Sequence, residues 1–187
     1  DISDKKIKEY LPKDETLLTL MKKSYDILKN HPVNLDRIKR GLRPANSIWI
    51  WGNGTKPNLN TYAEKFGIRG AVVSAVDLIR GIGVCAGLDV IEVIGATGNV
   101  HTNFEGKAEA AVKALRNGAD FVYIHLEAPD EAGHRHEIEN KVKSIEMIDE
   151  KIVAPVIKAL EADNEEFAIL IMPDHPTPLA IRTHTSD

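Results

Sequence analysis

The sequence predicts an α/β fold in which a mostly parallel sheet carries helices on both faces. Three observations support this prediction: short apolar runs alternate with helical patterns, the runs have the length of strands, and the helical patterns are long enough to cross over a sheet. The apolar runs lie at residues 48–51, 71–74, 90–94, 121–126 and 168–172, and the helical patterns at about 76–86, 106–117 and 137–162.

Two helices are marked most clearly by their apolar stripes. Between residues 14 and 30, Leu17, Met21 and Tyr25 recur at helical spacing, and His31-Pro32 follows as a stop signal. Between residues 137 and 162, a stripe that includes Ile138 and Ile145 predicts one long helix, with a kink or break at Pro155.

Composition describes an ordinary globular domain. The 187 residues are 43% hydrophobic and carry a formal net charge of −4, so the chain can bury a core and shows no basic footprint for nucleic acid. The single cysteine, Cys85, has no partner for an internal disulfide, which favours the reducing cytoplasm. We expect no membrane segment, because no apolar run has the length of a span, and the first residues do not resemble a signal sequence.

Acidic and imidazole side chains gather in three clusters late in the chain. Asp130 and His134 follow the apolar run 121–126, Asp174 and His175 follow the run 168–172, and His184 lies near the carboxyl terminus. Neutral imidazole and carboxylate suit Zn, Mn or Fe, and the carboxyl ends of parallel strands meet at one edge of a sheet. The pattern therefore predicts a metal site. The alternative is that these residues are ordinary turn and loop residues.

Local geometry is expected to bring each pair together. The spacing of Asp130 and His134 would place both on one face of a helix, but Gly133 favours a tight loop instead. Pro176 keeps His175 out of the helical region, so that Asp174 and His175 can both turn toward metal from a loop. We exclude two other histidines from the site. His125 is expected within a strand, and His136 at the start of the next helix.

The motifs resemble those of cofactor-independent phosphoglycerate mutases of the archaeal type, in the alkaline phosphatase superfamily. The resemblance rests on residues 130–134, 174–178 and 182–187, with further likeness at 46–52 and 95–98, and covers most of the chain from about Val33. It implies an alkaline-phosphatase-like fold and two divalent metal ions, with Mn expected and Zn, Co or Mg as alternatives. By the same resemblance, Asp130, His134 and His184 hold one ion, and Asp174 and His175 are ligands of the other.

The implied reaction interconverts 3-phosphoglycerate and 2-phosphoglycerate through a phosphoserine, so the partner is a small phosphorylated acid. Arg37 and Arg40, with Arg43 behind them, are candidates to bind its phosphate, because arginine binds phosphate through two hydrogen bonds. A solvated linker is the alternative for this basic segment. Lys107 is a further candidate, since it follows a glycine-containing loop that opens a helix. A helix cap at Thr102 or Asn103 explains that loop equally well.

The resemblance also predicts how the chain is organised. Residues 1–44 are expected to be the end of an inserted cap region, and residues 45–187 part of the metal-binding catalytic domain. The nucleophilic serine is expected outside this chain, Ser3 is not a candidate, and the polypeptide alone is expected to lack mutase activity. A related phosphotransferase similar to homoserine kinase, a metal-dependent phosphatase and a metal-free interaction module remain as alternatives.

Overall fold

The computed structural model describes residues 5–52 and 54–186, so Ser3 and Asp187 lie outside it. The chain divides into two compact units, Asp1–Lys56 and Pro57–Asp187. This division leaves the expected boundary between cap and catalytic regions, at residue 44, as a prediction. In the described part of the chain, no helix combines the length and the apolar character that crossing a bilayer requires.

The first unit contains a 3-10 turn, η1 (Ile7–Tyr10), and two helices, α1 (Glu15–Leu28) and α2 (Pro32–Lys39). The helix predicted at 14–30 is confirmed as α1, and Asp14 caps it by accepting a hydrogen bond from the Leu17 backbone N–H at 2.9 Å. Buried Asn34 donates to the carbonyls of Leu28 and Ala45. This amide therefore ties the chain after α2 back to α1.

The strand predicted at 48–51 is wrong. The segment is extended but pairs with no strand, and the Ile48 N–H donates to the Ser24 hydroxyl on α1 at 3.0 Å. Trp51 is 79% exposed. Alternating Ile and Trp residues have strand propensity, but a strand also needs a neighbour to complete its backbone hydrogen bonds.

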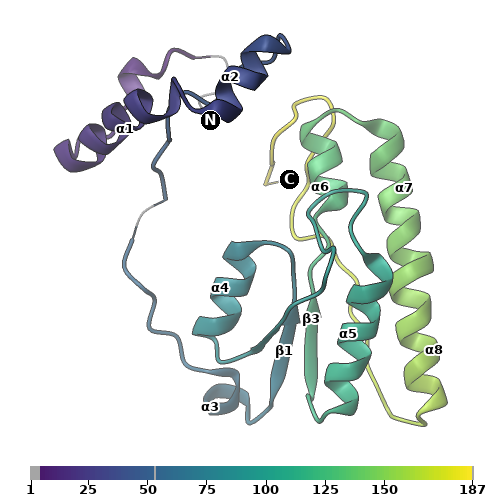
Figure 1. Ribbon diagram of the computed structural model, residues 1–187. Helices are drawn as coiled ribbons and strands as arrows, with labels where there is room; N and C mark the ends of the chain where they lie inside the picture. The colour runs from purple at the N-terminus through teal and green to yellow at the C-terminus, as the bar shows by residue number, and fades with distance from the viewer. Residues whose placement is uncertain (1–4, 53, 187) are drawn as a thin grey trace. The chain divides into compact units, whose positions relative to one another are not determined.

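The second unit is built on a small parallel sheet (Figure 1). Its strands are β1 (Gly70–Val73), β2 (Asp89–Ile91) and β3 (Phe121–Ile124), and their order in the sheet is β2-β1-β3. The helices are α3 (Tyr62–Phe66), α4 (Asp77–Cys85), α5 (Phe104–Arg116), α6 (Ala128–His134), α7 (Ile138–Ile148) and α8 (Ala154–Ala162).

Helices cover both faces of this sheet, as predicted. On one face Gly83 of α4 lies so close to Val72 that an added Cβ would be 2.6 Å from Val72 Cγ1. Val73 and Ile124 are adjacent in the β1–β3 register, one residue on from Val72, so their side chains face the other way. There Ile124 packs against the main apolar cluster. It is formed by α5, α6, the segment Asp149–Val153 and α8, through Phe104, Ala108, Val112, Ala128, Ile152, Val156 and Leu160.

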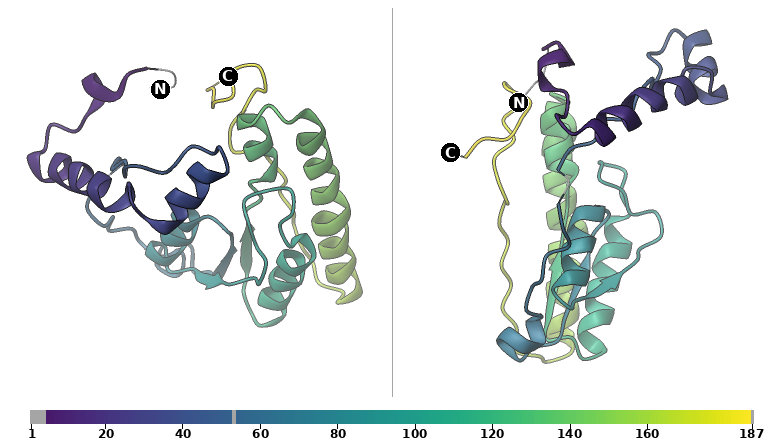
Figure 2. Two further views of the ribbon diagram at one scale, coloured as in Figure 1. Left: turned by 45° about the horizontal axis from the view of Figure 1, so that its top comes forward. Right: turned by 90° about the vertical axis from the view of Figure 1, so that its left-hand side faces the viewer.

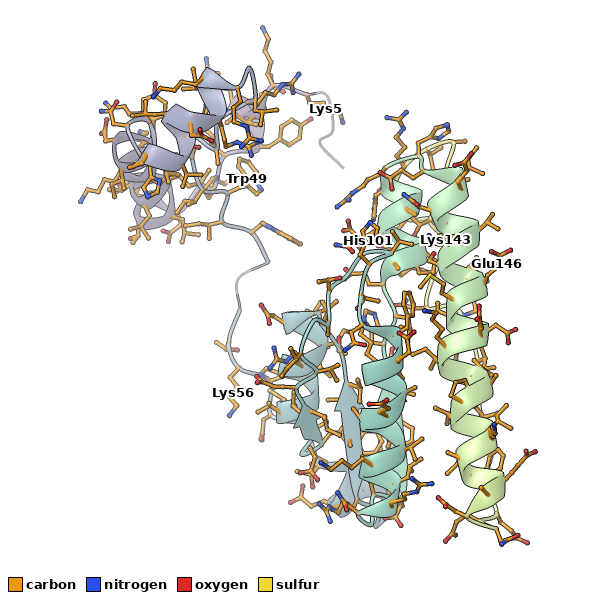
Figure 3. All side chains as sticks on the ribbon, turned by 45° about the vertical axis from the view of Figure 1, so that its right-hand side comes forward. Lys5, Trp49, Lys56, His101, Lys143 and Glu146 are labelled. Carbon is orange, nitrogen blue, oxygen red and sulfur yellow. The ribbon has the colours of Figure 1, made fainter. Side chains whose placement is uncertain are left out.

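The long helix predicted at 137–162 is continuous but contains a wider turn. A π-helical segment, Asp149–Val153, joins α7 to α8 just before Pro155. Proline offers no N–H to the helix, and the π turn accommodates that loss without ending the rod. Lys143 and Glu146 project into solvent from α7 (Figure 3).

The strand predicted at 168–172 is also wrong. The segment runs as an extended chain after α8, and Figure 2 draws it without a strand arrow in both views. Leu170 is 81% exposed and Met172 67%. Five apolar residues in a row have the composition of a buried strand, but no described strand lies in hydrogen-bonding register with them.

Candidate metal centre

Helix α6 presents Asp130 and His134 on one face, one turn apart. The carboxylate Oδ2 of Asp130 lies 3.4 Å from Nε2 of His134. The tight loop that we expected from Gly133 is therefore wrong, because the glycine lies inside α6.

Gly133 does not form a turn. It allows the loop after His175 to pack closely on α6. A Cβ at this position would lie 2.6 Å from the backbone oxygen of Thr177 and 2.9 Å from its Cγ2. Only glycine lets the loop after His175 pack this closely on α6. The absence of a side chain at Gly133 thus lets the segment that carries Asp174 and His175 lie against α6, which carries Asp130 and His134.

Three side chains then hold the carboxyl-terminal loop by its carbonyl oxygens. Lys141 Nζ donates to the Thr177 oxygen at 2.9 Å, His136 Nδ1 lies 2.7 Å from the Leu179 oxygen, and His134 Nδ1 lies 2.9 Å from the Arg182 oxygen. We call these three residues the loop clamp. His136 does not begin a helix as predicted. It lies in the turn before α7 with a left-handed φ of 59°.

With the loop held, four of the five predicted ligands lie together. Nε2 of His184 is 3.2 Å from Oδ1 of Asp130 and 3.0 Å from Nε2 of His134. The rings of His175 and His184 lie 3.8 Å apart between centroids. Potential ligand atoms of Asp130, His175 and His184 all lie within 4.8 Å of one another.

These spacings fit a metal ion. Ligands at the usual Zn–N distance on a tetrahedron are about 3.4 Å apart, close to the 3.0, 3.2 and 3.4 Å separations among Asp130, His134 and His184. The Arg182 carbonyl can only accept, so His134 carries its proton on Nδ1 and directs the lone pair of Nε2 into the cluster. A second contact orients His175: the Thr177 hydroxyl donates to Asp130 and lies 3.3 Å from His175 Nδ1.

The fifth predicted ligand, Asp174, lies at the margin of this group. Its Oδ1 is 3.8 Å from Nε2 of His175, and its side chain is 63% exposed. Burial raises the pKa of Tyr123 on β3, and the Asp174 carboxylate raises it further. Asp174 therefore lies beside His175, within electrostatic reach of β3.

Each of the three residues predicted to bind substrate contacts another group of the protein. Arg37 and Arg40 belong to the first unit, where Arg37 Nε donates to the Arg43 carbonyl at 2.8 Å and Arg40 pairs with Asp36 at 3.2 Å. Lys107 on α5 is 1% exposed, and its ammonium donates to the His125 carbonyl at 3.4 Å. Burial lowers the pKa of Lys107. Asn103 caps the start of α5, as the helix-cap alternative predicted, because its side-chain oxygen accepts a hydrogen bond from the Gly106 N–H at 2.9 Å.

Three further residues lie near the cluster: Ser74 and Glu127, which the sequence analysis did not single out, and His125, which it wrongly expected within a strand and excluded. Ser74 and His125 are the first residues after β1 and β3, and Ser74 Oγ lies 3.3 Å from His125 Nδ1. Glu127 is the residue before α6 but makes no capping hydrogen bond with its side chain, and its carboxylate packs against Gly98. Burial raises the pKa of Glu127, with Glu131 and Asp130 adding to the shift. The available signal was position, because Ser74 and His125 directly follow β1 and β3, and Glu127 comes two residues later, at the edge where the clusters were expected.

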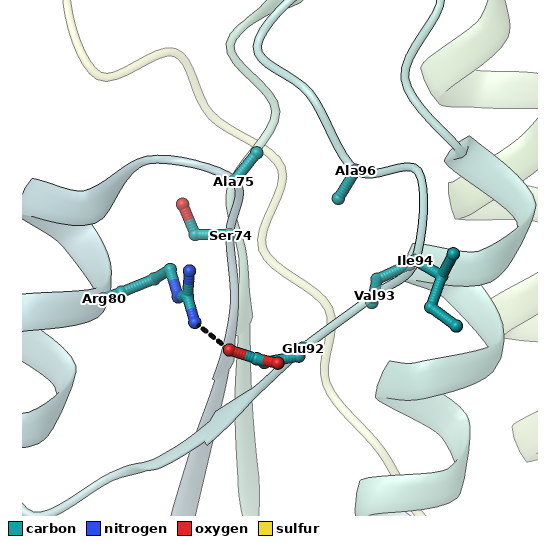
Figure 4. Close-up of a pocket in the computed structure, with 7 residues that line it drawn as sticks. All are labelled: Ser74, Ala75, Arg80, Glu92, Val93, Ile94 and Ala96. Atoms are coloured by element: carbon teal, nitrogen blue, oxygen red, sulfur yellow. Dashed lines mark hydrogen bonds and ion pairs between the residues drawn. The ribbon is translucent and has the colours of Figure 1, made fainter.

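A hollow of about 250 Å³ lies at this same edge (Figure 4). Its lining includes Ser74, Arg80 and Glu92, and Arg80 Nη2 pairs with Glu92 Oε1 at 2.6 Å. The hollow opens beyond the ends of β1 and β2, where parallel sheets commonly bind ligands.

Comparison with known proteins places these features in context. The model of the Metalloenzyme superfamily matches residues 13–187. The 2,3-bisphosphoglycerate-independent phosphoglycerate mutase of Methanosarcina barkeri is 53% identical over 100% of this chain and 48% of its own length. A probable mutase of the same name from Geobacter sulfurreducens is also 53% identical, over 99% of this chain and 47% of its own. The chain thus spans about half the length of these curated relatives.

Among solved structures, the PH0037 protein from Pyrococcus horikoshii has a similar fold. It aligns with a TM-score of 0.69 and 32% identity, covering 91% of this chain and 44% of the other.

Proposed function

Because the chain belongs to the Metalloenzyme superfamily, we propose that it supplies the metal-binding part of a 2,3-bisphosphoglycerate-independent phosphoglycerate mutase that acts in the cytoplasm. The observation that carries the proposal is the meeting of Asp130, His134, His175 and His184 at one edge of the sheet. The names of the relatives supply the activity, that of a phosphoglycerate mutase. The family resemblance specifies it as interconversion of 3-phosphoglycerate and 2-phosphoglycerate.

Each residue has a definite task in this proposal. Asp130, His134 and His184 hold one divalent ion, and Asp174 and His175 contribute to a second, with Mn as the expected metal. Divalent ions at such a site neutralise phosphoryl oxygens and lower the pKa of an attacking hydroxyl. The Arg182 carbonyl and the Thr177 hydroxyl keep the two imidazoles oriented. Arg37, Arg40 and Lys107 remain the candidates for the anionic substrate.

Metal binding is tested by thermal melting of the 187-residue chain with and without Mn or Zn. An ion at a hundred times its dissociation constant stabilises a folded chain by about 2.7 kcal/mol, or roughly 5–10 °C for a chain of this size. We expect His184→Ala to abolish this shift. The matched control is His101→Ala, since His101 is exposed on a loop and belongs to no ligand group. An equal shift in both variants would contradict the proposed site.

The reaction is tested on a chimera, since the relatives are about twice as long. Residues 1–187 replace the matched part of the Methanosarcina barkeri protein, and 2-phosphoglycerate formation is followed by coupling to enolase. Mutase turnover that His184→Ala removes would support the proposal. Release of inorganic phosphate, or phosphoryl transfer from a nucleotide, in place of 2-phosphoglycerate formation would favour the phosphatase or the phosphotransferase instead.

A further inference from the structure

The residue pair Ser74 and His125 lies where the path of the chain across the sheet reverses. From β1 the chain crosses to β2 on one side, and after α5 it returns to β3 on the other side of β1. The crevice beyond the carboxyl ends of two such strands is the usual ligand site of an open parallel sheet. Val73 and Ile124 are in register at the ends of these strands, so Ser74 and His125 are the next pair.

The hydrogen bonds of Ser74 fix the proton of the imidazole. The Ser74 oxygen accepts from the Val76 N–H at 3.0 Å, and Ser74 as a residue is 6% exposed. Its own proton needs an acceptor, and His125 Nδ1 at 3.3 Å is the one that the described structure offers. Ser74 therefore donates to Nδ1, and the neutral ring carries its proton on Nε2.

The backbone and surroundings of His125 hold the ring in place. The His125 N–H donates to the Val73 carbonyl at 2.9 Å, and the Lys107 ammonium donates to the His125 carbonyl. The ring stacks beside Tyr123 with centroids 6.3 Å apart. Burial lowers the pKa of His125 and Lys107 lowers it further, whereas Asp174 and Asp130 act in the opposite direction. Burial and Lys107 thus favour the neutral form of the ring.

The other ring nitrogen is left free. Within residues 5–52 and 54–186, no protein group forms a hydrogen bond with Nε2 of His125, and no buried side-chain nitrogen or oxygen lacks a partner. Nε2 therefore reaches solvent. An imidazole serving only to join β1 to β3 has no need of an open N–H, and the charges of Asp174 and Asp130 lie close enough to act on this ring.

Resting on the proposed function, we propose that His125 contacts the substrate: its Nε2–H, positioned by Ser74, donates a hydrogen bond to an oxyanion oxygen of the phosphorylated acid beside the metal cluster. Asp130 and Asp174 repel an anion when the site is without cations. Bound divalent cations would turn this repulsion into attraction. A neutral N–H donor at this place could then donate a hydrogen bond to a phosphoryl or carboxylate oxygen of the attracted anion.

The first test is the tautomer, read from the ring nitrogen resonances of His125 in the metal-free chain by NMR. We expect the Nε2–H tautomer, and a mixture of tautomers in Ser74→Ala. A proton on Nδ1, or a spectrum unchanged by Ser74→Ala, would overturn the positioning role of Ser74.

The second test measures inorganic phosphate binding to the Mn-loaded chain by calorimetry. His125→Phe keeps a ring but removes the donor, and should weaken phosphate binding about tenfold. His125→Gln places an amide N–H near the position of Nε2 and should recover most of the affinity. Mn affinity should stay unchanged in both variants. No phosphate binding by the Mn-loaded parent chain, equal phosphate affinity in the two variants, or a loss of Mn binding as large as in His184→Ala, would each overturn the inference.

The two proposals fail in different ways. If the chimera shows no mutase turnover but phosphate affinity still depends on the donor at residue 125, the mutase assignment falls and the anion contact stands. If the chimera is active and His125→Phe changes neither its kcat nor its KM, the contact falls and the mutase assignment stands. Appearance of a phosphoryl group on Ser74 by mass spectrometry would also overturn it, because Ser74 would then be the nucleophile and not the positioning residue.

Discussion

Replacing Gly133 by alanine isolates the contact that joins the metal clusters. The added Cβ would lie 2.6 Å from the Thr177 oxygen, so this backbone atom would have to retreat by roughly 0.8 Å to reach ordinary contact distance. Overpacking of this kind costs about 1–3 kcal/mol. Alanine returns at most about 1 kcal/mol of helix propensity, and less here, because Gly133 is the residue before the end of α6. The net loss should be about 1 kcal/mol or more.

Gly81→Ala is the matched control, because Gly81 lies inside α4 and an added Cβ would meet nothing within 4 Å. This control should gain about 0.5–1 kcal/mol. For a chain of this size, 1 kcal/mol corresponds to about 2–4 °C, so thermal melting should separate the two variants by roughly 3–8 °C. Gly133→Ala should also bind Zn about 10–100-fold more weakly, since Thr177 orients Asp130 and His175. A Gly133→Ala protein as stable as Gly81→Ala, with full Zn affinity, would refute the packing of the loop on α6.

Three further predictions concern the supports of the site. Thr177→Val removes a buried hydroxyl that donates to Asp130, and should lower the free energy of unfolding by about 1.5–3 kcal/mol in urea denaturation. Thr177→Ser should keep most of it. His136→Ala opens the loop clamp at Leu179 and should weaken Zn binding in calorimetry, whereas His101→Ala should not. The pKa of Lys107 is lowered by burial, so the unfolded chain holds this proton more tightly. The free energy of unfolding should therefore gain a contribution as pH rises through the lowered pKa toward 10.5, and Lys107→Met should remove that part of the pH dependence.

Periodicity predicted the elements whose causes are local. The runs that became β1, β2 and β3 and the helical patterns between them were correct within a few residues, because apolar spacing and helix caps are written in neighbouring residues. The runs at 48–51 and 168–172 have the same composition but form no strand. Strand formation depends on a partner in register, and that partner is not visible in the run itself.

Gly133 shows why a residue type alone misled us about α6. Glycine between Ala132 and His134 was taken as a turn signal, since it is a poor helix former. In the fold, glycine is required here because Thr177, which lies 44 positions away in the chain, packs directly on the helix and leaves no room for a Cβ. The cost of glycine in the helix is accepted because any side chain would push the loop away from Asp130. A tertiary requirement of this kind leaves no trace in the local pattern.

The same reasoning separates the predicted ligands from His125, which we excluded. That the predicted ligands would lie close together was predictable because carboxylate and imidazole have coordination chemistry that residue type alone reveals, and because parallel strand ends share an edge. His125 carries the same imidazole, but its meaning depends on which nitrogen holds the proton. That is decided by Ser74, which the β1–β3 register places beside it, and Ser74 is in turn held by the Val76 N–H at the turn into α4. The chemistry of one ring thus follows from the pairing of two strands whose partner residues are 51 positions apart, and becomes readable only once the register is known.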